Sequence, residues 1–186
     1  GIQYCLGATA RQAIINNFNW SITDAGQNCV VDIPDANFKA SLLSNTEINS
    51  LDDGEISVSE AAAFTGRFTA NNAGITDITG IEFFTNISEF VVPSNSITNA
   101  DFSHNPELIF IGINNNSLIE LNVTSNEKLV DLRCYNNAGI NSLALSHNAF
   151  LEVLWAANCS LNALDLSKNS LLQDIWISNN ALSSLD

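Results

Sequence analysis

Basic side chains are scarce in this sequence. Its 186 residues include 6 Lys and Arg against 20 Asp and Glu, so the formal net charge is −14. A surface this acidic repels the phosphate backbone of nucleic acid and the anionic headgroups of a membrane. We therefore expect no nucleic-acid partner.

Long apolar runs are absent as well. No stretch approaches the roughly 20 apolar residues that cross a bilayer, and no charged start followed by an apolar segment indicates a signal peptide. We predict no membrane insertion. The chain begins at "GIQYC" and stops at "LSSLD", which suggests part of a longer protein, so further repeats or domains of the same chain are expected as neighbours.

Cysteine is limited to four residues, and two of them bracket a short N-terminal unit. A disulfide between Cys5 and Cys29 would close a loop of about two dozen residues, which is modestly stabilising. The small size of the enclosed unit favours this disulfide. The alternative is that both are unpaired small hydrophobic residues.

A repeat is the clearest feature that the sequence does contain. Aligned on the first leucine of each unit, the spacings are 21, 21, 22 and 21 for Ile87, Leu108, Leu129, Leu151 and Leu172. The pattern is LxxLxLxxNxL followed by xxLDLSxNxx, and a fixed period with this content indicates a solenoid. The 22-residue spacing comes from an extra glycine in "NNAGI". The same five letters at 71–75 place a first, less regular repeat around 67–86, whose register the sequence does not fix.

Across residues 67–186 this pattern resembles the leucine-rich repeat family, in particular the short 21-residue type of bacterial secreted and surface proteins. The resemblance implies an α/β leucine-rich repeat solenoid. Its fold would be a right-handed β-solenoid horseshoe with a parallel concave sheet and few helices. Because the second halves also follow LxxLxL, we expect short extended segments there rather than full helices.

The columns of the repeat have a physical reason. Apolar residues at positions 1, 4, 6 and 11 point inward and stack into a continuous ladder. Asparagine at position 9 can satisfy backbone groups that leucine could not. Asn105, Asn126, Asn148 and Asn169 form a second column at the return turn. Cys159 replaces the position-9 asparagine in one repeat and Cys134 lies at inward position 6, so we expect both thiols to be structural.

Residues 31–66 supply a cover for the first repeat. A helix is predicted to start near Pro34 and Asp35, and a second helix in "SEAAAF" to end at Gly66. Between them "INSLDDGEISVSE" has a mid-loop glycine, so the segment resembles an EF-hand. The internalin family covers its first repeat with an EF-hand-like cap that binds no metal, and this region looks similar.

Scored as a twelve-residue calcium loop, the segment offers an incomplete set of ligands. Leu51 at position 3 has no oxygen, and position 1 is Asn rather than Asp. We therefore predict no cofactor, with a weak calcium site as the alternative; its ligands would be Asn49, Asp53, Glu55 and Glu60. Without calcium, Glu60 and Asp53 would serve the helix start and the turn.

Residues 1–30 form a different unit. Helical spacing in "TARQAIINNFN" and alternation at Trp20 and Ile22 predict a helix followed by a strand. This resembles the end of a preceding repeat or domain. We thus expect three parts: 1–30, the cap at 31–66 and the repeats at 67–186.

Residues at strand positions 3, 5 and 7 cannot point inward, so we expect them on the concave face. This places two tryptophans beside each other with tyrosine and phenylalanine nearby and an arginine between acids. Exposed aromatic clusters indicate a binding site. The predicted ligand-binding residues are Phe110, Asp131, Arg133, Tyr135, Trp155, Asp174 and Trp176. Alternatively, neighbouring repeats cover these residues, or the tryptophans only shield the sheet.

Motifs of common enzymes are missing: there is no GxGxxG, GxxxxGK[ST], HExxH or CxxC. The only histidines, His104 and His147, lie in equivalent "SHN" triplets roughly 10 Å apart, too far to share a metal readily. We expect no catalytic residues.

We therefore predict a non-enzymatic recognition module that binds a protein or an extracellular glycan through its concave face. The family resemblance implies an extracellular or bacterial cell-surface location and a role in adhesion. Two alternatives remain at this point. The chain is a structural spacer in a large surface protein, or an accessory domain of an enzyme whose catalytic part lies outside it.

Overall fold

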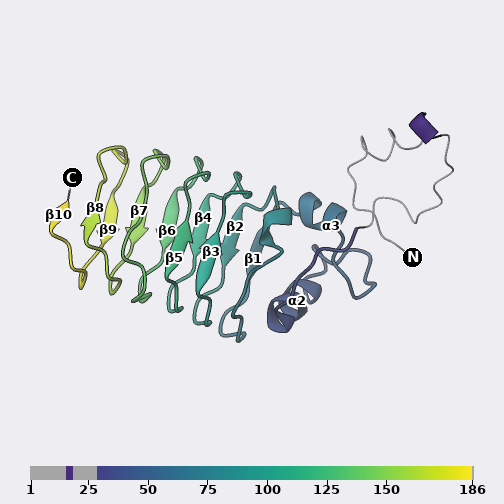
Figure 1. Ribbon diagram of the computed structural model, residues 1–186. Coiled ribbons are helices and arrows are strands. Elements are labelled where there is room, and N and C mark those ends of the chain that lie inside the picture. The colour runs from purple at the N-terminus through teal and green to yellow at the C-terminus, as the bar shows by residue number, and fades with distance from the viewer. Residues whose placement is uncertain (1–15, 19–28, 186) are drawn as a thin grey trace.

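The computed structural model describes residues 16–18 and 29–185. Flat turns of chain are stacked in single file, with the helices α2 and α3 at one end and β10 at the other (Figure 1). The elements are α2 (Ala36–Leu43), α3 (Val58–Ala63), β1 (Arg67–Thr69), η1 (Ile81–Phe83), β2 (Glu89–Val91), β3 (Asn99–Asp101), β4 (Phe110–Gly112), β5 (Glu120–Asn122), β6 (Asp131–Arg133), β7 (Val153–Trp155), β8 (Ala163–Leu164), β9 (Asp174–Trp176) and β10 (Ser184–Leu185).

One side of the stack is a six-stranded parallel sheet in the order β1-β2-β4-β6-β7-β9. Its register follows the repeat, because Phe110 pairs with Asp131 and Arg133 pairs with Trp155. The opposite side, which we call the return side, carries two short parallel pairs, β3-β5 and β10-β8. This is the predicted leucine-rich repeat solenoid with few helices, and the predicted short extended return segments are present. The structure also fixes the register of the first repeat, since Arg67 pairs with Glu89.

The core is the stack of inward columns. Leu108, Leu129 and Leu151 are fully buried, as is Ile87 in the preceding turn, whereas Leu172 in the last turn is partly buried. Cys134 is fully buried among them, and Cys159 is 7% exposed. Burial of one leucine side chain stabilises a fold by about 1.5–3 kcal/mol, so the repeated column is the main source of stability.

Two asparagine columns hold the turns at their ends. In the first, the Asn137 amide donates to the carbonyls of Ile113 and Cys134 at 3.1 and 2.8 Å and accepts from Leu118 N at 3.1 Å. In the return column, Asn126 donates to the carbonyls of Phe102 and Asn105 at 3.0 and 2.7 Å. Each amide therefore links its turn to the preceding one.

A third row of asparagines runs along the surface at the end of the sheet. Asn115, Asn136, Asn158 and Asn179 all have positive φ, between 52° and 57°. Asparagine tolerates this left-handed conformation better than most residues. Successive side chains also donate to each other, with Nδ2 to Oδ1 distances of 2.6, 2.7 and 2.7 Å.

The return side is interrupted at residues 141–145, which form no strand. The cause is the extra glycine of the 22-residue repeat. A Cβ on Gly139 would lie 2.5 Å from the carbonyl oxygen of Leu118, so this turn needs glycine to pass that close to the preceding turn. In the same turn Ile140 N donates to the backbone carbonyl of Asn137, whereas its counterpart Leu118 N donates to an asparagine side chain.

The cap is fixed to the first turn through Asp35. Its Oδ1 accepts from the amides of Asn37 and Phe38, which caps α2. Its Oδ2 accepts from Thr76 N, Thr76 Oγ1 and Asp77 N at 2.8, 2.7 and 3.2 Å. Burial acts to raise the pKa of Asp35, but these hydrogen bonds outweigh it and lower the pKa to about 2.

Aromatic rings continue the core from the cap into the solenoid. Phe38 of α2 packs edge-on against Phe68 and Phe90, with ring centroids 5.7 and 6.3 Å apart. The second helix, α3, ends at Ala63 and has its C-cap at Phe64. The sequence prediction of an end at Gly66 was therefore three residues too long.

The predicted N-terminal unit falls almost wholly outside the described residues; of 1–28 only residues 16–18 are described, and they are helical. The division into 1–30, 31–66 and 67–186 stays a prediction. Among the described residues, no helix has the length and hydropathy of a membrane span.

Candidate functional site: the outward face of the six-stranded sheet

The pairing register aligns the outward-facing side chains of the six strands in rows across the sheet. One row contains Arg67, Glu89, Phe110, Asp131, Val153 and Asp174, and the next contains Thr69, Val91, Gly112, Arg133, Trp155 and Trp176. All seven predicted binding residues lie on this face. Some outward positions are nevertheless covered by larger neighbours: Val91 is 9% exposed and Ala157 is fully buried.

Three aromatic rings meet near the C-terminal end of the sheet, and we call Tyr135, Trp155 and Trp176 the aromatic patch. The centroid of the Tyr135 ring lies 6.2 Å from that of Trp155 and 5.1 Å from that of Trp176. The two indoles are 6.0 Å apart at an interplanar angle of 81°, an edge-to-face contact. Trp176 remains 41% exposed. The patch is thus a mutually packed cluster that still presents aromatic surface to solvent.

Hydrogen bonds fix both indoles. Trp155 Nε1 donates to Asp174 Oδ2 at 3.0 Å, and Trp176 Nε1 donates to Ser178 Oγ at 2.8 Å. Both acceptors come from the same turn as Trp176. The rings are therefore held in one arrangement before any ligand binds, which lowers the ordering cost of binding.

Arginine and aromatic side chains alternate along the face. The Arg133 guanidinium lies over the rings of both Phe110 and Trp155, with Cζ 5.4 and 4.2 Å from the two centroids. The Arg67 guanidinium lies over Phe110 as well, at 5.4 Å. We call Arg67, Phe110, Arg133 and Trp155 the cation–π file. It joins the first strand of the sheet to the aromatic patch.

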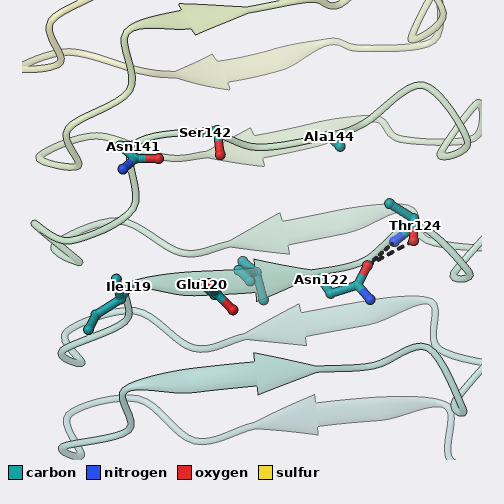
Figure 2. A pocket seen from close by; sticks show the side chains of 8 residues that line it. Ile119, Glu120, Asn122, Thr124, Asn141, Ser142 and Ala144 are labelled. Atoms are coloured by element: carbon teal, nitrogen blue, oxygen red, sulfur yellow. Dashed lines mark hydrogen bonds between the residues drawn. The ribbon is translucent and has the colours of Figure 1, made fainter.

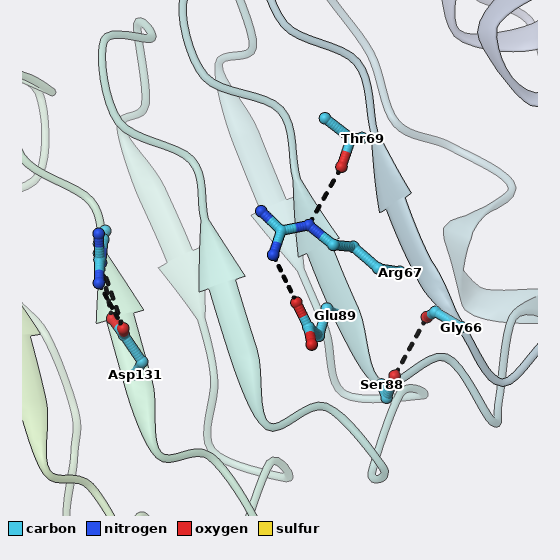
Figure 3. Close-up of polar contacts among 7 residues, drawn as sticks. Gly66, Arg67, Thr69, Ser88, Glu89 and Asp131 are labelled. Atoms are coloured by element: carbon cyan, nitrogen blue, oxygen red, sulfur yellow. Dashed lines mark hydrogen bonds and ion pairs between the residues drawn. The ribbon is translucent and has the colours of Figure 1, made fainter.

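Each arginine of the file is paired with an acid on the same face. Arg133 donates to both oxygens of Asp131, from Nε at 3.0 and 3.2 Å and from its terminal nitrogen at 2.8 Å. This hydrogen bonding outweighs the effect of burial and raises the pKa of Arg133. Arg67 donates to Glu89 at 2.9 Å and to Thr69 Oγ1 at 3.3 Å (Figure 3). Both guanidinium groups are thus oriented by an acidic side chain.

Arg67 and Glu89 belong to this site although the sequence prediction did not include them. Glu89 occupies the same strand position as Phe110 in the repeat. The sequence gives no reason to select it, because its partner Arg67 could not be placed. Arg67 lies in the first repeat, whose register could not be fixed, so its place on the sheet was unknown. Only the pairing of β1 with β2 reveals the arrangement. Arg67 on β1 and Arg133 on β6 lie on opposite sides of Phe110 on β4.

The polar groups of residues 49–60 form hydrogen bonds with one another. Glu60 Oε2 accepts from Ser57 N and Ser57 Oγ, and Oε1 accepts from Leu51 N at 3.0 Å, while Ser57 Oγ accepts from Glu60 N. This is a capping box at the start of α3. Burial acts to raise the pKa of Glu60, but the hydrogen bonds outweigh it and lower the pKa.

The other three potential calcium ligands also have protein contacts. Glu55 forms an ion pair with Lys39 at 2.6 Å, and Asp53 Oδ1 accepts from Glu55 N at 3.1 Å. Asn49 is buried and donates to the carbonyl of Leu43 at 3.3 Å. No group of three or more His, Cys, Asp and Glu side chains among the described residues is arranged to hold a metal ion. The donor set therefore does not fit calcium in this conformation.

The cysteines and histidines lie away from the sheet face. Cys134 and Cys159 are free and buried, and a hydrogen bond between the two thiols together with burial raises the pKa of Cys134. Cys29 is disulfide-bonded, but its predicted partner Cys5 lies outside the described residues, so the pairing stays a prediction. His104 and His147 are on return turns, and each ring has Nδ1 3.2 Å from the hydroxyl of the preceding serine.

A separate hollow of about 330 Å³ lies on the return side, where the strands are interrupted. Ile119, Glu120, Asn122 and Thr124 line it from one turn, and Asn141, Ser142 and Ala144 line it from the next (Figure 2). It contains no histidine, cysteine or basic side chain, and its one carboxylate is that of Glu120. The hollow borders residues 141–144 of the 22-residue repeat, and we assign it no ligand.

The fold and the site together define a leucine-rich repeat solenoid with a helical cap and a patterned, aromatic sheet face. No model of a known protein family matches the sequence, and no curated protein matches it. Solved structures do match. An internalin (InlF) from Listeria monocytogenes superposes with a TM-score of 0.67 at 20% sequence identity, over 82% of this chain and 49% of that one.

A second similar structure is internalin C2 (InlC2) of the same species. Its TM-score is 0.63 at 20% identity, over 82% of this chain and 73% of that one. The chain thus spans about half the length of the first of these internalins and about three quarters of the second. At this level of identity the comparison establishes that the fold is an internalin-like leucine-rich repeat solenoid.

Proposed function

We propose that this chain is a non-enzymatic recognition module which binds a partner on the outward face of its six-stranded sheet. The observation that carries the proposal is the aromatic patch. Tyr135, Trp155 and Trp176 are held by hydrogen bonds and by each other on a rigid sheet, and Trp176 keeps 41% of its surface in water. Exposed, pre-ordered Trp and Tyr side chains are enriched at binding hot spots.

The variation along the strands supports the same proposal. The inward columns repeat leucine-like residues, whereas the outward rows change from charged to aromatic between adjacent turns. Packing requires the first pattern, but nothing in the fold requires the second. The partner is a protein or an extracellular glycan, since both pack on aromatic side chains.

The likeness to internalins supports a location at the bacterial cell surface and a role in adhesion, as the family resemblance implies. The residues of the sheet face include no histidine and no cysteine, and both described histidines lie on return turns. This composition supports binding rather than catalysis.

The test is a comparison of the unchanged chain with Trp155→Ala/Trp176→Ala in a pull-down from host and bacterial surface extracts and on a glycan array. We expect the double variant to lose at least about tenfold in affinity, since hot-spot truncations cost about 2 kcal/mol or more. The matched control is Phe150→Ala, which removes an exposed aromatic ring (59% exposed) outside the sheet face.

Equal binding by the double variant and the unchanged chain would exclude the aromatic patch as the site. If the unchanged chain captured no partner in either assay, the spacer interpretation would replace recognition. A loss of binding in Phe150→Ala as large as in the double variant would place the site outside the sheet face.

A further inference from the structure

The charges on the sheet face do not balance. Its two basic groups, Arg67 and Arg133, form ion pairs with Glu89 and Asp131 respectively. Asp174 is a third acid on this face, and no basic group of the described residues forms an ion pair with it. Asp174 thus has no ion-pair partner of its own beside the aromatic patch, although the charge of Arg133, which is paired with Asp131, also acts on it.

The position of this carboxylate is defined by the strand. Asp174 and Trp176 are two residues apart on β9, so their side chains leave the same face of the sheet. Asp174 Oδ2 accepts the indole N–H of Trp155 at 3.0 Å. Its other oxygen, Oδ1, accepts no hydrogen bond from any described residue. The side chain is exposed, so Oδ1 is available to a donor from solvent or from a partner.

The two indoles differ in what covers them. Trp155 already has a cation on its ring, the Arg133 guanidinium at 4.2 Å. Among the described residues no cation lies over Trp176, and its ring is 41% exposed. Trp176, next to the last member of the cation–π file, thus offers a second indole without a cation, with the carboxylate of Asp174 beside it.

We infer that the partner is a polypeptide that sets a lysine or arginine side chain against Trp176, with the carboxylate of Asp174 as its counter-ion. This inference rests on the proposed function and specifies the ligand of that same face. A cation gains from both groups, because an indole attracts it through its ring quadrupole and a carboxylate through its charge. The net charge of −14 also attracts basic partners over longer distances.

The geometry favours a side chain over a sugar. The interplanar angles within the aromatic patch are 81°, 55° and 42°, so no two rings share a plane. The carboxylate of Asp174 separates the two ligands, because a basic side chain gains from its charge and a neutral sugar does not. Anionic glycans are further disfavoured by the acidic surface.

The experiment uses tryptophan fluorescence as a local reporter. The chain has three tryptophans, so Trp20→Phe leaves Trp155 and Trp176 as the only indoles. The probe is a soluble Gly-Ser peptide carrying several spaced arginines, compared with the same peptide in which neutral citrulline replaces each arginine. Titrations are followed at low ionic strength and again at about 0.15 M salt, where exposed charges are partly screened.

The discriminating variant is Asp174→Asn in the Trp20→Phe background, because asparagine still accepts the Trp155 indole N–H but lacks the charge. We expect it to weaken binding of the arginine peptide about three- to tenfold. The matched control is Glu120→Gln, which removes the same unit of charge from the return side (Figure 2). It should change the affinity less than about twofold.

The possible outcomes separate this inference from the proposed function. If citrulline and arginine peptides bind equally, or Asp174→Asn binds like its parent, the inference is wrong while recognition through the patch stands. If neither peptide changes the fluorescence of Trp155 and Trp176, the inference is also wrong. If binding of a natural partner depends on both tryptophans but not on Asp174, the partner is neutral at this contact and the inference is wrong. Binding to a glycan on the array would then identify the class of partner.

Discussion

The two sides of the solenoid are built from nearly the same six-residue pattern, yet they differ in continuity and in variety. The sheet side is a single ladder of six strands, while the return side is two pairs separated by residues 141–145. The sheet side varies its outward residues from turn to turn. The return side repeats a buried asparagine at its turn, and most of its outward residues are polar, as at Asn99, Asp101 and Glu120.

The repeat pattern therefore makes the turns stack on both sides. One inserted residue decides whether the parallel strand pairing continues from turn to turn. Gly139 is that residue, because it brings its turn against the Leu118 carbonyl and redirects the amide of Ile140. The interruption falls on the side without the aromatic patch. The sheet that carries the proposed binding face is left intact.

The largest expected effect comes from the buried asparagines of the return side. Asn126→Leu removes the side-chain amide that donates to the buried carbonyl oxygens of Phe102 and Asn105. Each oxygen then lacks this hydrogen bond. We expect the free energy of unfolding to fall by about 2–4 kcal/mol, measured by urea denaturation. The control Asn114→Ala, on the sheet face, should cost less than about 0.5 kcal/mol. Equal losses would mean that the return column is not a structural requirement.

A smaller effect is expected where the two sides each carry a glycine. Gly139→Ala would place a Cβ 2.5 Å from a backbone oxygen, and we expect a loss of about 1–3 kcal/mol in unfolding free energy. Gly112→Ala on the sheet side meets only the side chains of Val91 and Phe110, at 3.3 and 3.4 Å, which can shift. Its cost should be below about 1 kcal/mol. The reverse order in a thermal or urea melt would contradict our account of the interruption.

The cap is joined to the return side through Asp35, which gives a pH-dependent prediction. Its folded pKa of about 2 lies below the ordinary value of 3.8, so its contribution is present above the unfolded pKa and is lost as the pH falls through the folded one. Allowing for solvent screening, we expect about 1–2 kcal/mol at pH 7. Asp35→Asn should lower Tm at pH 7 and approach the unchanged chain between about pH 4 and pH 2. A constant Tm difference across this range would contradict the assignment.

A prediction of similar or smaller size concerns the coupling between Gly139 and Cys159. Regular turns use the position-9 asparagine as acceptor, as when Leu161 N donates to Asn180 Oδ1 at 3.0 Å. Deleting Gly139 should let Ile140 N donate to the position-9 residue of the next turn, which is Cys159. Cys159 is a poor partner there because thiol sulfur is a weak acceptor. Cys159→Asn should therefore be more favourable by about 1 kcal/mol in the deletion variant than in the unchanged chain. A double-mutant cycle showing additivity would exclude this coupling.

The smallest effect on stability is expected from the sheet face itself. Trp155→Ala/Trp176→Ala removes partly exposed rings, so unfolding should become easier by only about 1 kcal/mol even though partner binding is lost. Circular dichroism and a melt on the same preparation check this. A loss comparable to that of Asn126→Leu would show that the patch is part of the core and would leave the binding result uninterpretable as a site effect.

Much of this arrangement could be predicted from the sequence because its cause is periodic. The leucine column indicates which strand positions face outward, and the seven residues predicted to bind a ligand do lie on one face; their binding role stays a prediction. Arg67 was missed because its repeat is irregular. The interruption at 141–145 was missed because the sequence reveals an inserted glycine but not which backbone oxygen it approaches. The capping role of Glu60 was among the expected alternatives, whereas the link from Asp35 to Thr76 joins residues 41 apart and has no local pattern.

Phe110 has a consequence for the stiffness of the face as a whole. Its ring lies beneath two guanidinium groups that belong to strands on opposite sides of it, so side chains from β1 to β7 restrict one another's rotamers. A partner that docks on the proposed face would therefore meet a surface whose disorder was removed when the chain folded. A smaller residue at this one position would loosen both arginines and so make the proposed face less ordered before binding.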